Sequence, residues 1–216
     1  MRACAVAVLV AFARTASADS GTATNGGTAS ASTPPHLAQA FIQGGIAFTG
    51  EFVIAPGPIC NFPGAPSCIL GTGGGLALRI GRRLRGPLYL GAAYEFSKME
   101  SNQLYRLAIL QQFRAEGRYY VFTGRSTEPY FGVTAGAAGY GNVWGVDTAG
   151  PLFGATVGAE FQISTYIVLG LAISYRAIFF TRFTDSADTT RPPDGIGPSF
   201  SHLIGVDLIL ETRDPL

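Results

Sequence analysis

Eight segments of this chain alternate large apolar residues with small or polar ones, and this two-residue period constrains the fold more than any other feature. Successive side chains of a β-strand point to opposite faces, so each segment predicts a strand with one apolar face. In 88–97 one set of alternate residues is Leu88, Leu90, Ala92, Tyr94 and Phe96, and the other is Tyr89, Gly91, Ala93, Glu95 and Ser97. The segments span about 39–53, 72–84, 87–98, 104–122, 129–143, 151–163, 166–180 and 199–211.

The connections between these segments alternate in length. The first, third, fifth and seventh are 54–71, 99–103, 144–150 and 181–198, and the others are 85–86, 123–128 and 164–165. Long loops on one side and short turns on the other are typical of outer-membrane barrels, and most segments reach the 9–11 residues that a tilted spanning strand needs. We therefore predict an all-β fold, an eight-stranded antiparallel up-and-down transmembrane β-barrel, over 38–212. An even strand number would put both barrel ends on the periplasmic, short-turn side, with a C-terminal tail at 213–216.

The composition agrees with contact with lipid. Charged residues make up 13% of the chain, about half the usual share, and the mean hydropathy is +0.27. Low charge with high hydrophobicity excludes a disordered chain. The net charge of +1 excludes a nucleic-acid binder that works through a basic face.

The N-terminus predicts export. Residues 1–18 contain Arg2, an apolar run from Ala3 to Ala13, and Ala16-Ser17-Ala18, the pattern of a cleaved signal peptide. Residues 19–37 predict a flexible periplasmic tail. Cleavage removes Cys4 and leaves Cys60 and Cys68, which predict a disulfide in an oxidising compartment. Free thiols are the alternative, and no histidine lies near them in sequence to complete a metal site.

Strand parity assigns most charges in the segments to the barrel interior. A charge facing lipid costs about 2–4 kcal/mol at the bilayer midplane, whereas an inward charge can pair with an opposite one. The predicted interior charges are Glu51, Arg79, Arg83, Glu95, Arg106, Arg114, Glu116, Arg118, Glu160, Arg176, Asp207 and Glu211. Equal numbers of both signs predict a plugged interior, and a gate whose ion pairs exchange is the functional alternative.

Two other folds compete with this interpretation. A soluble ligand-binding barrel would also alternate, but it would put its large apolar residues inside. The run 163–180 has the length of a transmembrane helix, although Tyr175, Arg176 and many β-branched residues disfavour one.

Three segments carry a family resemblance: 115–120 (Ala-Glu-Gly-Arg-Tyr-Tyr), 128–132 (Glu-Pro-Tyr-Phe-Gly) and 157–161 (Val-Gly-Ala-Glu-Phe). With the signal peptide and the strand pattern, they make 38–212 resemble the small outer-membrane barrels of Gram-negative bacteria, of the outer membrane protein A, W and X types, within the porin-like superfamily. The resemblance implies insertion into the outer membrane by its assembly machinery, as a monomer among outer-membrane lipid and lipopolysaccharide. The family's terminal aromatic is absent after 211, so we expect an atypical insertion signal.

Candidate catalytic residues are few. His202 lies beside Ser199 and Ser201, but strand parity points His202 and Ser201 to opposite faces, and Gly71 to Gly75 lacks the lysine of a phosphate loop. We expect no catalytic residue, cofactor or metal, and no nucleic-acid partner. The sequence favours a non-enzymatic barrel with a structural or surface-interaction role. A narrow channel for small solutes is the first alternative, and a lipid A-modifying enzyme is the second.

Overall fold

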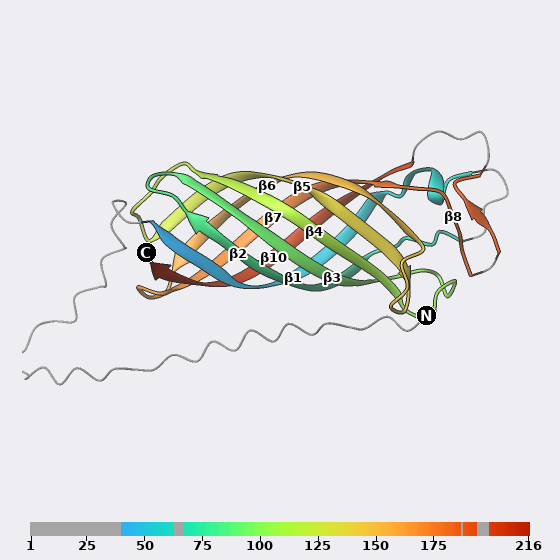
Figure 1. Ribbon diagram of the computed structural model, residues 1–216, viewed down its shortest axis with the longest axis horizontal. Coiled ribbons are helices and arrows are strands. Elements are labelled where there is room, and N and C mark those ends of the chain that lie inside the picture. The colour runs from blue at the N-terminus through green and yellow to red at the C-terminus, as the bar shows by residue number, and fades with distance from the viewer. Residues whose placement is uncertain (1–39, 63–66, 187, 194–198) are drawn as a thin grey trace, which may run out of the picture. The chain divides into compact units, whose positions relative to one another are not determined.

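The computed structural model describes residues 40–62, 67–186, 188–193 and 199–216 of the 216-residue chain. Eight strands close into one antiparallel barrel in the order β1-β10-β7-β6-β5-β4-β3-β2 (Figure 1). These strands are β1 (Phe41–Ala55), β2 (Gly73–Arg83), β3 (Leu88–Met99), β4 (Ala108–Tyr120), β5 (Thr127–Asn142), β6 (Thr148–Gln162), β7 (Ile167–Phe180) and β10 (Ser199–Pro215). The predicted fold is confirmed. The predicted signal peptide at 1–18 and the whole of the predicted tail at 19–37 lie outside the described residues.

Two boundaries differ most from the predictions. β10 continues to Pro215, because β1 offers it partners as far as Phe41, so most of the expected tail belongs to the last strand. β4 begins at Ala108, because the preceding residues turn: the Leu104 amide donates to the Ser101 carbonyl at 3.0 Å. The alternative of a helix at 163–180 is wrong, since β7 occupies this run. Among the described residues, no helix is long and apolar enough to cross a membrane.

The outer face of the barrel is a band of exposed apolar side chains. In the middle of β5, β6 and β7 it presents Val133, Val157 and Ile173, which are 66%, 60% and 54% exposed. Neighbouring residues of opposite parity, such as Thr134 and Ser174, point inward. This is the reverse of a soluble ligand-binding barrel, so that alternative is not supported.

Aromatic pairs lie on the outer face near both ends of the strands. Near the short turns, Tyr119 packs against Phe131 with ring centroids 5.2 Å apart. Near the long loops, Phe96 packs against Trp144 at 5.4 Å, and Phe179 packs against Phe200 at the same separation. Such girdles mark the two membrane interfaces of transmembrane barrels.

The long-loop end of the barrel is closed by a segment that we call the stopper, residues 56–62 and 67–72. It contains the 3₁₀ helix η1 (Gly57–Ile59) and the disulfide between Cys60 and Cys68, which confirms the predicted pair. Its buried residues Ile59, Cys60, Ile69 and Leu70 share one apolar cluster with strand and loop residues. The partners are Met99, Tyr105, Ala108, Leu110, Ala138, Tyr140, Leu152, Ile178, Phe180, Phe183 and Leu203.

A buried arginine ties the stopper to the last long loop, which carries the short strands β8 (Phe183–Thr184) and β9 (Thr190–Arg191). The Arg191 guanidinium pairs with Asp185 at 2.6 Å. It also donates to the backbone carbonyls of Ile59 at 2.8 Å and Ser67 at 3.3 Å. We call this set of contacts the clasp. It joins two loops that are far apart in sequence.

Candidate functional site in the barrel interior

The structure places eleven of the twelve predicted interior charges inside the barrel, each at most 6% exposed. These are Glu51, Arg79, Arg83, Glu95, Arg114, Glu116, Arg118, Glu160, Arg176, Asp207 and Glu211. Arg106 is the exception, and its predicted placement is wrong. It is exposed because it lies in the loop before β4, where strand parity does not apply.

Sequence reasoning missed two further interior charges, Glu128 and Arg213, which are 6% and 4% exposed. Each has the parity of an inward-pointing residue: Arg213 is two positions after Glu211, which was assigned inward, and Glu128 is two before Tyr130, which the structure buries. Both were placed outside the strands, so an earlier start of β5 and a later end of β10 would have found them.

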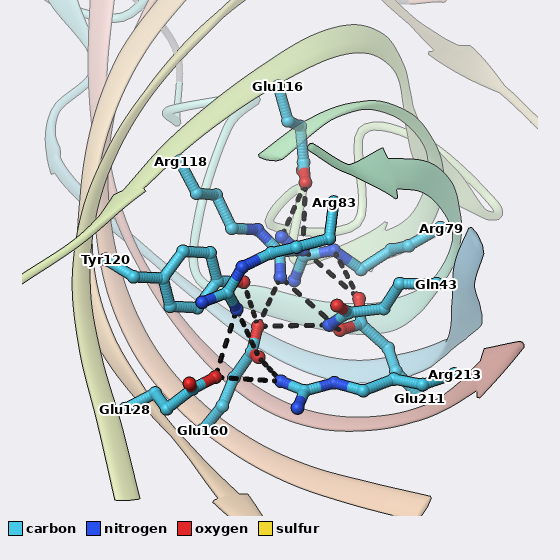
Figure 2. Close-up of polar contacts among 10 residues, drawn as sticks. All are labelled: Gln43, Arg79, Arg83, Glu116, Arg118, Tyr120, Glu128, Glu160, Glu211 and Arg213. Carbon is cyan, nitrogen blue, oxygen red and sulfur yellow. Dashed lines mark hydrogen bonds and ion pairs between the residues drawn. The ribbon is translucent and has the colours of Figure 1, made fainter. Parts of the chain in front are cut away.

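The charges nearest the short turns form a first network, centred on Arg118 (Figure 2). Arg118 pairs with Glu160 at 2.8 Å, with Glu211 at 3.1 Å and with Glu116 at 3.2 Å. Glu116 also accepts from Arg79 at 2.7 Å. Each carboxylate in this set therefore lies against at least one guanidinium, which offsets much of the cost of its burial.

Two more arginines extend the first network toward the short turns. Arg83 pairs with Glu128 at 3.0 Å, while Arg213 pairs with Glu128 at 3.2 Å and with Glu160 at 2.6 Å. The Arg83 guanidinium also lies 3.3 Å above the ring centroid of Tyr120. Aromatic faces attract cations, so the interior tyrosines are part of the same network. Figure 2 shows these side chains converging from opposite walls of the barrel.

A second network lies nearer the stopper and is built on Arg176. Its guanidinium donates to Glu51 and to Glu95, both at 2.8 Å, and pairs with Asp207 at 3.5 Å. Arg114 joins the two networks, because it pairs with Glu95 at 2.7 Å and with Glu116 at 3.2 Å. The described interior is thus crossed by a continuous chain of ion pairs.

Among the described residues, a small cavity lies within the first network. This cavity beside Arg79, Glu116 and Arg118 holds about 10 Å³, roughly the space of one water molecule. Above the second network, the apolar cluster of the stopper fills the barrel mouth. Burial in this cluster, and then the neighbouring Asp147 carboxylate, raise the pKa of the loop residue Tyr105. Its phenol therefore stays protonated and neutral.

The residues weighed for catalysis do not come together. Ser201 points inward and donates to the Pro56 carbonyl at 2.7 Å. His202 lies on the other face, where its Nδ1 is 2.6 Å from the Tyr175 hydroxyl and its ring stacks on the tyrosine. Within the described part of the chain, no group of three or more His, Cys, Asp or Glu residues could hold a metal ion.

Comparison with known proteins identifies the fold. No family model matches the chain, and no curated protein matches it. The crystal structure of Neisserial surface protein A (NspA) is similar over 82% of this chain and 97% of that one, with 15% identity and a TM-score of 0.51. The solid-state NMR structure of outer membrane protein AlkL in DMPC bilayers is similar over 90% and 98%, with 14% identity and a TM-score of 0.50. The chain therefore has the fold of the eight-stranded outer-membrane β-barrels.

Proposed function

We propose that this protein is a non-enzymatic, non-conducting barrel of the bacterial outer membrane that presents its clasped long loops at the cell surface as an interaction surface. In barrels of this fold the short turns face the periplasm and the long loops face outward. The lipid-facing band between two aromatic girdles supports the membrane location. The outer-membrane insertion machinery and the surrounding lipid are the partners that this location implies, and a monomer suffices because the barrel has no free strand edge.

The observation that carries the proposal is that the barrel is blocked at two levels. Arginine–carboxylate networks cross its interior, and the apolar stopper fills its outer mouth. An eight-stranded barrel is just wide enough for side chains to fill it. Opening a path would require breaking buried ion pairs, each at a cost of about 3–5 kcal/mol when one partner is lost.

The test is conductance across a planar lipid bilayer into which the purified, folded protein has been inserted. We expect no discrete openings over a wide range of salt and voltage, while a general porin in the same bilayers conducts. Reproducible small openings would overturn the closed-barrel proposal and favour the narrow channel for solutes. Incubation with lipid A tests the non-enzymatic part, and we expect its mass to be unchanged.

A further inference from the structure

A cleft lies at the long-loop end of β3 and β4, outside the barrel interior. It has a volume of about 490 Å³, within the range of small-molecule sites. Residues 98–108 form most of its lining, and Ser67 of the stopper completes it. Its charged side chains are Lys98, Glu100 and Arg106, all of them exposed.

Hydrogen bonds hold the walls of this cleft in place. The Asn102 side chain donates to the Cys68 carbonyl at 2.7 Å, and the Gly71 amide donates to the Glu100 carbonyl at 2.7 Å. On the other side, the Leu107 amide donates to Oδ1 of Asn142 at 3.2 Å. The loop is thus tied to the disulfide-bonded stopper and to β5, so the cleft is formed before any ligand arrives.

The cationic groups of the cleft are available to a ligand. Among the described residues, neither Lys98 nor Arg106 forms an ion pair, in contrast to the arginines of the interior. Glu100 is the single acidic residue that lines the cleft. The cleft therefore carries an excess of one positive charge.

The position of Lys98 indicates which ligand the cleft meets. Along the outer face of β3, Lys98 is two residues beyond Phe96, which packs against Trp144 in the outer aromatic girdle. Two residues of a tilted strand rise about 5 Å along the membrane normal. The ammonium group thus lies just outside the apolar band, at the level of lipid headgroups.

We propose that Lys98 and Arg106 bind the phosphorylated sugar headgroup of a lipopolysaccharide molecule in the outer leaflet, with its acyl chains against the neighbouring outer face of β3. This assignment of a ligand rests on the proposed function, because it requires the long loops to face outward. The contacts are charge-assisted hydrogen bonds from the ammonium and guanidinium groups to phosphate oxygens. Glu100 opposes this binding by like-charge repulsion.

The unique tryptophan, Trp144, is a built-in reporter for this site. The experiment titrates folded protein in detergent with diphosphorylated lipid A and follows Trp144 fluorescence. The same titration is made with dephosphorylated lipid A and with inorganic phosphate alone. The variants are Lys98→Gln, Arg106→Gln, their combination, and Glu100→Gln.

We expect saturable binding of diphosphorylated lipid A, weakened about five- to tenfold by each of Lys98→Gln and Arg106→Gln. Glu100→Gln strengthens binding, about twofold. The matched control is Arg125→Gln, which removes one exposed cation beside Phe122 at the short-turn end and leaves the affinity unchanged. Circular dichroism and the gel mobility of unheated samples verify that every variant is folded.

Equal affinity for dephosphorylated lipid A would overturn the assignment, because binding would then come from the acyl chains. Unchanged affinity in the double variant would also overturn it. Inorganic phosphate that binds as tightly as the lipid would show a free-anion site instead of a headgroup site. None of these titrations depends on conductance, so a failure of this assignment is distinguishable from a failure of the closed-barrel proposal.

Discussion

At the scale of single residues, burial decides how much a charge matters. Arg118 is 3% exposed and is shared by three carboxylates, so its loss would leave the first network with excess negative charge in the buried interior. Arg82, three positions along β2 from Arg79, has the opposite parity and is exposed. Arg118 and Arg82 therefore have the same side-chain chemistry but lie in different environments.

We expect Arg118→Gln to lower the free energy of unfolding by about 3–5 kcal/mol, because it leaves buried carboxylates without their arginine partner. Arg82→Gln, the control, changes this free energy by no more than about 0.5 kcal/mol. The measurement is urea unfolding in detergent micelles, followed by tryptophan fluorescence. Equal stability of the two variants would show that the interior ion pairs contribute little.

At the scale of strands, small residues determine how closely the backbones of neighbouring strands approach each other. Gly136 of β5 points inward opposite Arg114, and a Cβ added there would lie 2.0 Å from the Phe113 carbonyl oxygen. Gly117 of β4 points outward, where an added Cβ would make ordinary contacts at 3.8 Å with the Leu90 side chain. Glycine is therefore required at the first position and merely present at the second.

Gly136→Ala should destabilise the barrel by about 1–3 kcal/mol through overpacking, whereas Gly117→Ala should be close to neutral. Both variants can be compared by the temperature at which the barrel loses its fast migration on gels. A similar midpoint for the two would contradict the close approach seen between β4 and β5.

The clasp predicts how the long loops respond to a protease. Arg191→Gln leaves the Asp185 carboxylate and the carbonyls of Ile59 and Ser67 without their shared partner. Charge-assisted hydrogen bonds contribute about 1.5–3 kcal/mol each, so we expect chymotrypsin to cleave the long loops at least about tenfold faster. Barrel stability should not change, and Arg125→Gln should cleave like the original protein. Unaltered cleavage of Arg191→Gln would show that the disulfide alone orders the stopper.

The alternation of residues was enough to predict the strands, their number and most of the interior charges, because the two faces of a barrel wall differ so strongly in environment. The alternation gave wrong or missing assignments at strand ends and in loops, where the two-residue period stops. Arg106 was assigned by parity although it lies in a loop, and Glu128 and Arg213 were missed at strand ends. The clasp could not be predicted either, since no pattern in the sequence pairs Arg191 with the stopper.

At the scale of the whole molecule, the structure separates three environments: an apolar outer band, a charged interior and a polar outer rim. The apolar band exposes large side chains on each of the eight barrel strands, as expected of a surface that lipid covers. Val133 lies at the middle of the band and is 66% exposed, while Val146 is 54% exposed in the turn beyond β5.

Val133→Arg should cost about 2–4 kcal/mol of unfolding free energy in phospholipid vesicles, since it puts a charge at the bilayer midplane. Val146→Arg, the same chemical change at the level of the outer girdle, should cost at most about 1 kcal/mol, because the cost falls near the membrane interfaces. Reversible unfolding in guanidinium chloride measures both. Equal costs would mean that lipid does not cover the middle of this face.

The clasp also determines what an antibody would recognise on this protein. Because Arg191 joins the stopper to the last loop, two segments more than a hundred residues apart are held together at the long-loop end of the barrel. A synthetic peptide that copies either segment alone lacks the other segment. Antibodies raised against such peptides would therefore bind the heated, unfolded chain better than the folded protein, whereas antibodies raised against the folded barrel would show the opposite preference.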